Sequence, residues 1–172
     1  MKLFKTFVYV IAIALVAAWG YGYKALNTEK NYVLDPGTID KTSPPCLQMY
    51  YNIDKYAAEY GIPRNYAFGI AHAETGYRGP FHWEYNQALT SSAGAVGPMQ
   101  IMPRYAHPYV DGSFTVEELK TDIEMNVKAS MRMLRKLYSM HGDWKLAFGA
   151  YNTGQPCVNG YAQEVASYVP NY

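Results

Sequence analysis

Apolar residues recur every three or four positions along much of this chain, and this spacing predicts a mainly helical fold. In the first such stretch, Leu47, Tyr50 and Ile53 share one face. Ser43 is placed to cap the start of this helix, and Gly61 is placed to end it. The sequence has no internal repeat and no alternating strand pattern longer than a few residues. We therefore expect one helical domain with an appendage, within a length of 172 residues.

Similar boundary signals mark the other predicted helices. Pro63 opens the second, which runs to about Thr75 and stops at Gly76. The sequence Thr115-Val-Glu-Glu118 has the form of a capping box and begins a long helix that ends at Gly142. Shorter helices are expected from Pro98 to Met102, from Trp144 to about Asn152 after an Asp143 cap, and from about Tyr161 to Val169, whereas residues 77–96 are expected to be irregular.

The N-terminus carries an uncharged segment of 18 residues, "TFVYVIAIALVAAWGYGY", between Lys5 and Lys24. A helix of this length spans roughly 27 Å, close to the thickness of bilayer hydrocarbon. We expect an uncleaved membrane anchor over residues 1–24. A signal peptide cleaved after Val16-Ala17-Ala18 is the main alternative, and a buried core helix is a third.

The two export hypotheses place the domain outside the cytoplasm. It would lie in the periplasm behind a single pass through a bacterial inner membrane, or be exported after signal cleavage. Residues 25–45 are polar and are predicted to be a linker, and residues 46–172 are predicted to be the folded domain.

Charge and cysteine usage narrow the function classes. The net charge is +1 and no basic run occurs, which argues against nucleic acid as a partner. The four histidines lack the spacing of metal ligands, and we expect no metal and no cofactor. In an oxidising compartment Cys46 and Cys157 can form a disulfide, and two unrelated free thiols are the alternative.

Four segments occur in an order that carries a resemblance. They are "AHAETG" with Glu74, "SSAGAVGPMQIMP" from Ser91 to Pro103, "AFGAYNTG" from Ala147 to Gly154, and "EVASYV" from Glu164 to Val169. Together they resemble the catalytic domain of lytic transglycosylases, in the soluble-lytic-transglycosylase-like and goose-lysozyme-like superfamily. The resemblance covers about residues 46–170 and implies a lysozyme-like helical domain with a catalytic groove.

The chain departs from the family pattern in three places. Thr75 replaces the serine that follows the acid, and Pro98 replaces a leucine in the glycine-rich turn. Between Glu74 and Ser91 lie 16 residues, about twice the common spacing, and this insertion is a candidate flap over the groove. The added length also leaves Ser91 and Ser92 as competing candidates for one position in the groove.

The resemblance implies that Glu74 is the catalytic residue. A carboxyl group that follows an apolar helix can have its pKa raised by burial, as a general acid at neutral pH requires. Glu74 would protonate the bond between N-acetylmuramic acid and N-acetylglucosamine, then act as a base while a 1,6-anhydro ring closes. Tyr151 would hydrogen-bond Glu74 or the sugar, and Asn152 would tie neighbouring turns together. The substrate-binding residues implied by the family are Ser91, Met99, Gln100, Tyr151 and Asn152.

Two rival functions remain open at this point. Glu84, Asp111 or Asp143 could supply the second acid of a hydrolytic muramidase. A catalytically silent peptidoglycan-binding or assembly protein is the rival of another class. The expected partners are peptidoglycan glycan strands and the membrane, with secretion, conjugation or phage-entry machinery as possible settings.

Overall fold

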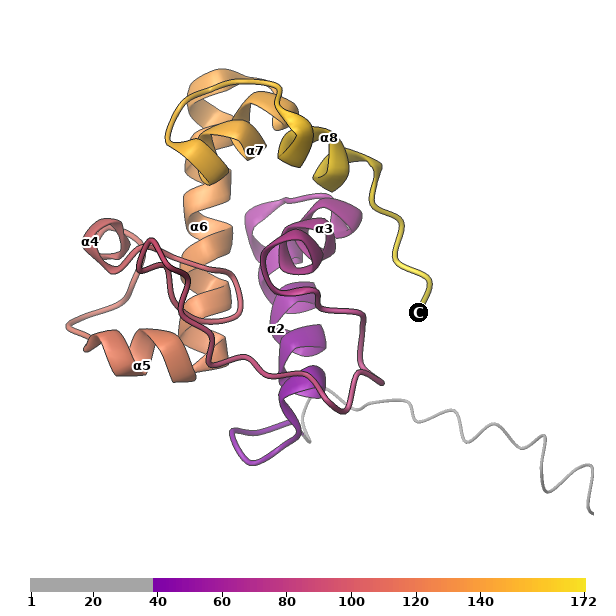
Figure 1. Cartoon of the computed structure of the whole chain (residues 1–172), viewed down its shortest axis with the longest axis vertical. Coiled ribbons are helices and arrows are strands. Elements are labelled where there is room, and N and C mark those ends of the chain that lie inside the picture. Colours follow the sequence, from indigo (N-terminus) through magenta and orange to yellow (C-terminus); the bar gives the residue numbers. More distant parts are fainter. Residues whose placement is uncertain (1–38) are drawn as a thin grey trace, which may run out of the picture. The chain divides into compact units, whose positions relative to one another are not determined.

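The computed structural model of this chain describes residues 39–172 (Figure 1). The predicted membrane anchor or signal peptide, and residues 25–38 of the predicted linker, lie outside the described residues. Within residues 39–172, no helix combines the length and the apolar character needed to cross a membrane.

The described part of the chain is helical and holds no strand, which confirms the predicted fold class. Its only extended pairing consists of two isolated bridges, Thr90 with Val96 and Val96 with Ile101. The helices are α2 (Pro45–Tyr60), α3 (Arg64–Thr75), α4 (Pro103–Ala106), α5 (Val116–Thr121), α6 (Ile123–His141), α7 (Trp144–Thr153) and α8 (Gly160–Ser167).

The long helix α6 organises the fold. It packs against α2 along one side and against α7 near its C-terminal end. Helix α8 packs against both α7 and α3 (Figure 1). The inward face of α6 carries fully buried Val127, Met131 and Leu134, which belong to one apolar core shared with α2 and α3. The fold therefore brings the C-terminal helices α7 and α8 against the helix that carries Glu74.

Most helix ends lie where the sequence predicts them. Gly61, Gly76 and Gly142 all adopt the left-handed conformation that ends a helix. Thr115 and Glu118 form the predicted capping box, with each side chain bonded to the other residue's backbone N–H.

Two boundaries differ from the prediction. Ser43 does not cap α2, because Asp40 Oδ1 accepts hydrogen bonds from both its N–H and its hydroxyl group, and Pro44 occupies the cap position. The long helix predicted from Thr115 to Gly142 is broken at Asp122, whose carboxylate accepts from the N–H of Met125 and caps α6.

The predicted disulfide is absent, and both cysteines are free thiols. Cys46 is buried in the first turn of α2, whereas Cys157 lies between α7 and α8. Figure 1 shows the start of α2 and the α7–α8 connection at opposite ends of the domain. Because a disulfide requires Cα atoms less than about 7 Å apart, two cysteines at these places cannot pair.

Candidate active site

Glu74 lies in the last turn of α3, one residue before the helix ends. Its side chain is partly buried, and the Tyr161 hydroxyl group donates a hydrogen bond of 2.6 Å to Oε1. Burial raises the pKa of Glu74 to about 7, while the hydrogen bond from Tyr161 acts in the opposite direction. Near neutral pH this carboxyl group is therefore present in both the protonated and the ionised form.

Close packing of α8 against α3 places Tyr161 beside Glu74. A Cβ atom on Gly69 of α3 would lie 2.8 Å from the carbonyl oxygen of Val165, so only glycine permits this approach. Asn159 caps α8 by accepting from the N–H of Ala162, which places Tyr161 in the first turn. Sequence reasoning missed Tyr161, because it belongs to none of the four motifs.

Tyr161 remains a hydrogen-bond donor at physiological pH. Its burial and the nearby Glu74 carboxylate both raise the pKa of its phenol well above the ordinary value. The phenol therefore stays protonated and holds Oε1, which leaves Oε2 of Glu74 available to a ligand.

Thr75 joins the end of α3 to the glycine-rich segment. Its hydroxyl oxygen lies 2.9 Å from the Pro98 carbonyl oxygen, 3.2 Å from that of Ala71 and 2.7 Å from the Tyr85 hydroxyl group. A carbonyl oxygen can only accept, and a hydroxyl group has a single proton to donate. Tyr85 must therefore donate to Thr75 while Thr75 donates to a carbonyl group. These hydrogen bonds connect the insertion, the end of α3 and the glycine-rich segment.

The glycine-rich segment forms a tight turn, so the helix predicted from Pro98 to Met102 is wrong. Val96 and Ile101 exchange two backbone hydrogen bonds of 2.9 and 3.0 Å, and the N–H of Gln100 donates to the Gly97 carbonyl group. Pro98 thus occupies a turn rather than the first turn of a helix, and Gln100 has a φ of +49°.

Asn126, in α6, holds this turn in place through hydrogen bonds of its side chain. It is fully buried, donates to the carbonyl groups of Val96 and Leu119 at 3.0 and 2.8 Å, and accepts from the N–H of Met99 at 2.9 Å. Gly97 has a φ of +76°, and a Cβ atom there would collide with Nδ2 of Asn126. Sequence reasoning missed Asn126, because a polar residue in a long helix is normally assigned to the solvent-facing side.

Tyr151 does not hydrogen-bond Glu74, so of its two predicted partners the sugar alone stays a prediction. Its hydroxyl group donates to the Met99 carbonyl group at 2.7 Å and lies 2.9 Å from the Ser130 hydroxyl group. Burial raises the pKa of Tyr151, and the charge of Glu74 raises it further. Tyr151 therefore lies near Glu74, but Tyr161 donates the hydrogen bond that Tyr151 was expected to donate to Glu74.

A groove of about 690 Å³ contains three of the predicted substrate-binding residues, Gln100, Tyr151 and Asn152. Glu74 is not among its lining residues, although its charge acts on Tyr151, which is. The other lining residues come from the glycine-rich segment and its continuation through α4, from α6 and from the end of α7; they are Ala93, Ile101, Met102, Arg104, Tyr105, Pro108, Tyr109, Met133, Leu137, Ala150, Thr153 and Gly154.

The remaining predicted residues lie outside the lining of this groove. Met99 is fully buried in the core. The Ser91 hydroxyl group accepts from the N–H of Ala95 and so shapes the loop, while Ser92 is exposed.

Asn152 lines the groove and accepts a 3.3 Å hydrogen bond from the Asn159 side chain, which ties the end of α7 to the cap of α8.

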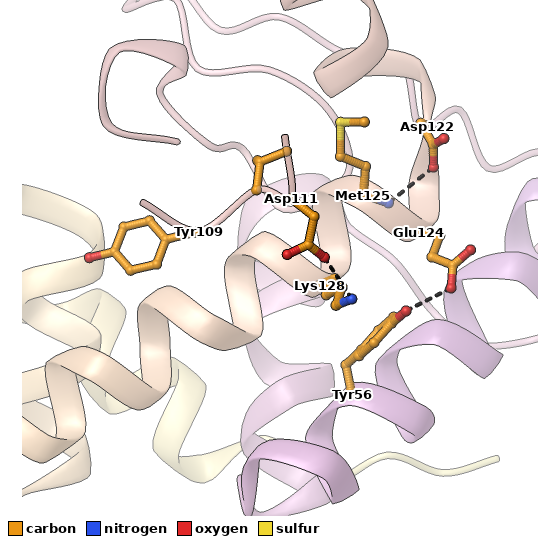
Figure 2. Close-up of a pocket in the computed structure, with 8 residues that line it drawn as sticks. Tyr56, Tyr109, Asp111, Asp122, Glu124, Met125 and Lys128 are labelled. Carbon is orange, nitrogen blue, oxygen red and sulfur yellow. Dashed lines mark hydrogen bonds and ion pairs between the residues drawn. The ribbon is translucent and has the colours of Figure 1, made fainter. Parts of the chain in front are cut away.

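A separate pocket of about 200 Å³ lies between α2, α6 and the segment before α5 (Figure 2). Its acids are paired with cations: Asp111 contacts Arg132 and Lys128 at 2.7 and 2.9 Å, and Lys55 contacts Glu124 at 2.9 Å. The contacts with Arg132 and Lys128 lower the pKa of Asp111 to about 2. A hydrogen bond from Tyr56, together with the contact from Lys55, lowers the pKa of Glu124. Such ionised, paired carboxylates are poor proton donors at neutral pH.

The helical fold is consistent with a lysozyme-like domain. The transglycosylase SLT domain family matches residues 51–169, most of the chain. The chain belongs to this family, which confirms the resemblance carried by the four sequence motifs. Membership supports peptidoglycan as the substrate and cleavage of the lytic-transglycosylase type in general.

Proposed function

We propose that this protein is a peptidoglycan lytic transglycosylase that cleaves the β-1,4 bond between N-acetylmuramic acid and N-acetylglucosamine. The observation that carries the proposal is the state of Glu74. Burial places its pKa at about 7, and Tyr161 is its one hydrogen-bond partner among residues 39–172. A group whose pKa lies near the working pH can donate a proton and later accept one.

The proposed reaction uses this carboxyl group twice. Glu74 first donates its proton to the glycosidic oxygen, and the bond from that oxygen to C1 of the muramyl residue breaks. The substrate's acetamido group stabilises the positive charge that develops at C1. The Glu74 carboxylate then removes the proton of the muramyl 6-hydroxyl group while O6 bonds to C1. The 1,6-anhydro product forms without consuming water, and Glu74 regains its proton.

Tyr161 and the turn are proposed to hold this arrangement in place. The phenol occupies Oε1, so proton transfer falls to Oε2. The hydrogen bonds from Tyr85 to Thr75 and from Thr75 to the Pro98 carbonyl group keep the end of α3 against the turn, and this turn places Gln100 in the lining of the groove.

Hydrolysis receives less support, because two of the three acids that could position a water molecule are engaged elsewhere. Asp111 is paired with Arg132, and Asp143 caps α7 by accepting from the N–H groups of Lys145 and Leu146. Glu84 lies exposed in the insertion. Of residues 39–172, no second carboxylate contacts Glu74.

The site of action forms part of the proposal. The uncharged segment over residues 6–23 favours export, with the domain acting outside the cytoplasm on a membrane anchor or after signal cleavage.

Product mass tests the reaction. Purified peptidoglycan digested with the full-length protein should release muropeptides with 1,6-anhydro ends, each lighter by one water than the hydrolytic product. Glu74→Gln should release none. Products with reducing muramyl ends would identify a muramidase. Binding without any release by the wild-type protein would indicate a catalytically silent one.

A further inference from the structure

The first part of the insertion that follows Glu74, residues 77–85, is fastened to the core at both ends. At its start Tyr77 is fully buried, and its hydroxyl group donates to the Cys46 carbonyl group at 2.7 Å. At its end Tyr85 is only 6% exposed and donates to Thr75. The two rings meet edge to face, with centroids 5.1 Å apart. Residues 78–84 therefore form a short loop held beside α3.

The loop over residues 78–84 exposes its two largest side chains to solvent. Phe81 is 63% exposed and Trp83 is 62% exposed, in contrast to the buried tyrosines at either end. Their ring centroids lie 6.3 Å apart with the planes inclined at 59°, so the two rings form one surface. Exposed apolar side chains that gather in one place are typical of a binding surface.

A hollow of about 400 Å³ lies at this surface, lined by Arg78, Phe81, His82, Trp83 and Glu84. Arg78 lies 3.0 Å from Nε2 of His82. Because arginine can only donate, Nε2 must accept, and this contact holds His82 in its neutral form. Desolvation and the charge of Arg78 lower the pKa of His82 in agreement with that form. The hollow thus combines two apolar rings with one cation, one anion and a neutral imidazole.

We propose that residues 78–84 form an additional glycan-binding subsite, in which Phe81 and Trp83 stack on the sugar rings of a peptidoglycan strand. A pyranose has apolar faces and hydroxyl-bearing edges, which match aromatic rings bordered by Arg78 and Glu84. This proposal rests on the proposed function, since it assigns the subsite to the strand that Glu74 cleaves. Trp83 lies only two residues from Tyr85, whose hydroxyl group contacts the residue next to Glu74.

A glycan fits this surface better than two other occupants. An anionic lipid surface would favour basic residues around the aromatic pair, whereas the hollow carries one charge of each sign. A second copy of the chain would require a larger apolar area than two rings provide.

Binding in a non-cleaving background tests the subsite directly. Full-length Glu74→Gln protein should co-sediment with insoluble peptidoglycan. Adding Trp83→Ala or Phe81→Ala should weaken that binding by about twofold to tenfold, the range given by one aromatic stacking contact. Met140→Ala is the matched control, because Met140 is 61% exposed at the far end of α6. In protein with Glu74 intact, Trp83→Ala should raise KM on polymeric peptidoglycan by the same factor and leave kcat unchanged.

Three results would overturn the subsite. They are unchanged peptidoglycan binding in Trp83→Ala, a loss confined to phosphatidylglycerol vesicles, and a change of oligomeric state without a change of glycan binding. The proposed function fails separately, if the wild-type protein forms no anhydro products. Weakened binding in Trp83→Ala would then still support a glycan surface.

Discussion

Two glutamates in this molecule accept the same hydrogen bond and have opposite pKa shifts. Tyr161 donates to Oε1 of Glu74 at 2.6 Å, and Tyr56 donates to Oε1 of Glu124 at 2.6 Å (Figure 2). The pKa of Glu74 is raised to about 7, whereas that of Glu124 is lowered.

The surroundings of the two pairs explain this difference. Lys55 lies 2.9 Å from Oε1 of Glu124, whose side chain is 46% exposed, so charge and solvent both favour ionisation. Glu74 is more buried, and no cation of residues 39–172 acts on it, so desolvation outweighs the hydrogen bond. A phenol favours the carboxylate in both places; at Glu74 burial outweighs this effect, whereas at Glu124 the Tyr56 hydrogen bond is the main cause of the lowered pKa and Lys55 adds to it.

The largest expected difference between the two glutamates is in catalysis. Glu74→Gln should lower peptidoglycan-cleaving activity by about 10²- to 10⁴-fold, the contribution typical of general acid–base catalysis. Glu124→Gln should leave the rate within about twofold of wild type, measured by release of soluble muropeptides. Comparable losses in both variants would abolish the distinction between a catalytic and a structural acid.

The pH dependence of stability should also separate them. Folded Glu74 keeps its proton to about pH 7, whereas the unfolded chain loses it near pH 4.3. The wild-type free energy of unfolding should therefore fall as pH rises through this window. Denaturation with urea should show Glu74→Gln more stable than wild type by about 1–2 kcal/mol at pH 8, and little different at pH 4.

Glu124 should show the opposite behaviour. Its lowered pKa stabilises the fold above the unfolded value, and this contribution is lost as pH falls through the folded value. Glu124→Gln should therefore cost up to about 1 kcal/mol at pH 7 and little at pH 3. Destabilisation of Glu74→Gln at pH 8 would contradict the assigned burial of Glu74.

Removing each phenol sharpens the comparison further. Tyr161→Phe deletes the interaction that lowers the pKa of Glu74, so that pKa should rise. The alkaline limb of the activity profile should then move up by about one pH unit, as expected from a hydrogen bond of about 1 kcal/mol. Tyr56→Phe is the control and should leave the profile in place. An unchanged limb in Tyr161→Phe would show that Tyr161 does not act on the acid.

Salt should produce the smallest effect. Raising NaCl from 50 mM to 0.5 M should weaken the exposed Lys55–Glu124 pair by less than about 1 kcal/mol. The alkaline limb governed by Glu74 should not move, because its partner is an uncharged phenol. A salt-dependent limb would reveal a charge acting on Glu74.

The sequence predicted the features that depend on neighbouring residues. Helix-ending glycines such as Gly76 and the capping box at Thr115 act within one turn of the chain, and Glu74 follows a recognisable apolar helix. The turn at 97–100 was predicted incorrectly, because Pro98 suits the start of a helix and the second position of a tight turn equally well.

Features set by tertiary packing could not be predicted in the same way. Tyr161 reaches Glu74 only because Gly69 lets α8 approach α3. The predicted pairing of Cys46 with Cys157 rested on cysteine number and compartment, and neither carries information about distance.

Asn126 links assembly of the groove to folding of the whole domain. The turn that it holds is closed by few backbone hydrogen bonds, chiefly the pair between Val96 and Ile101, and Gln100 is in a disfavoured conformation, so the turn is unstable alone. We expect it to form when α6 docks, and the backbone amides of Met99 and Ile101 to exchange their hydrogens only on global unfolding. A chain that is still folding would then lack a working groove, which delays any cutting of the cell wall until the domain is complete.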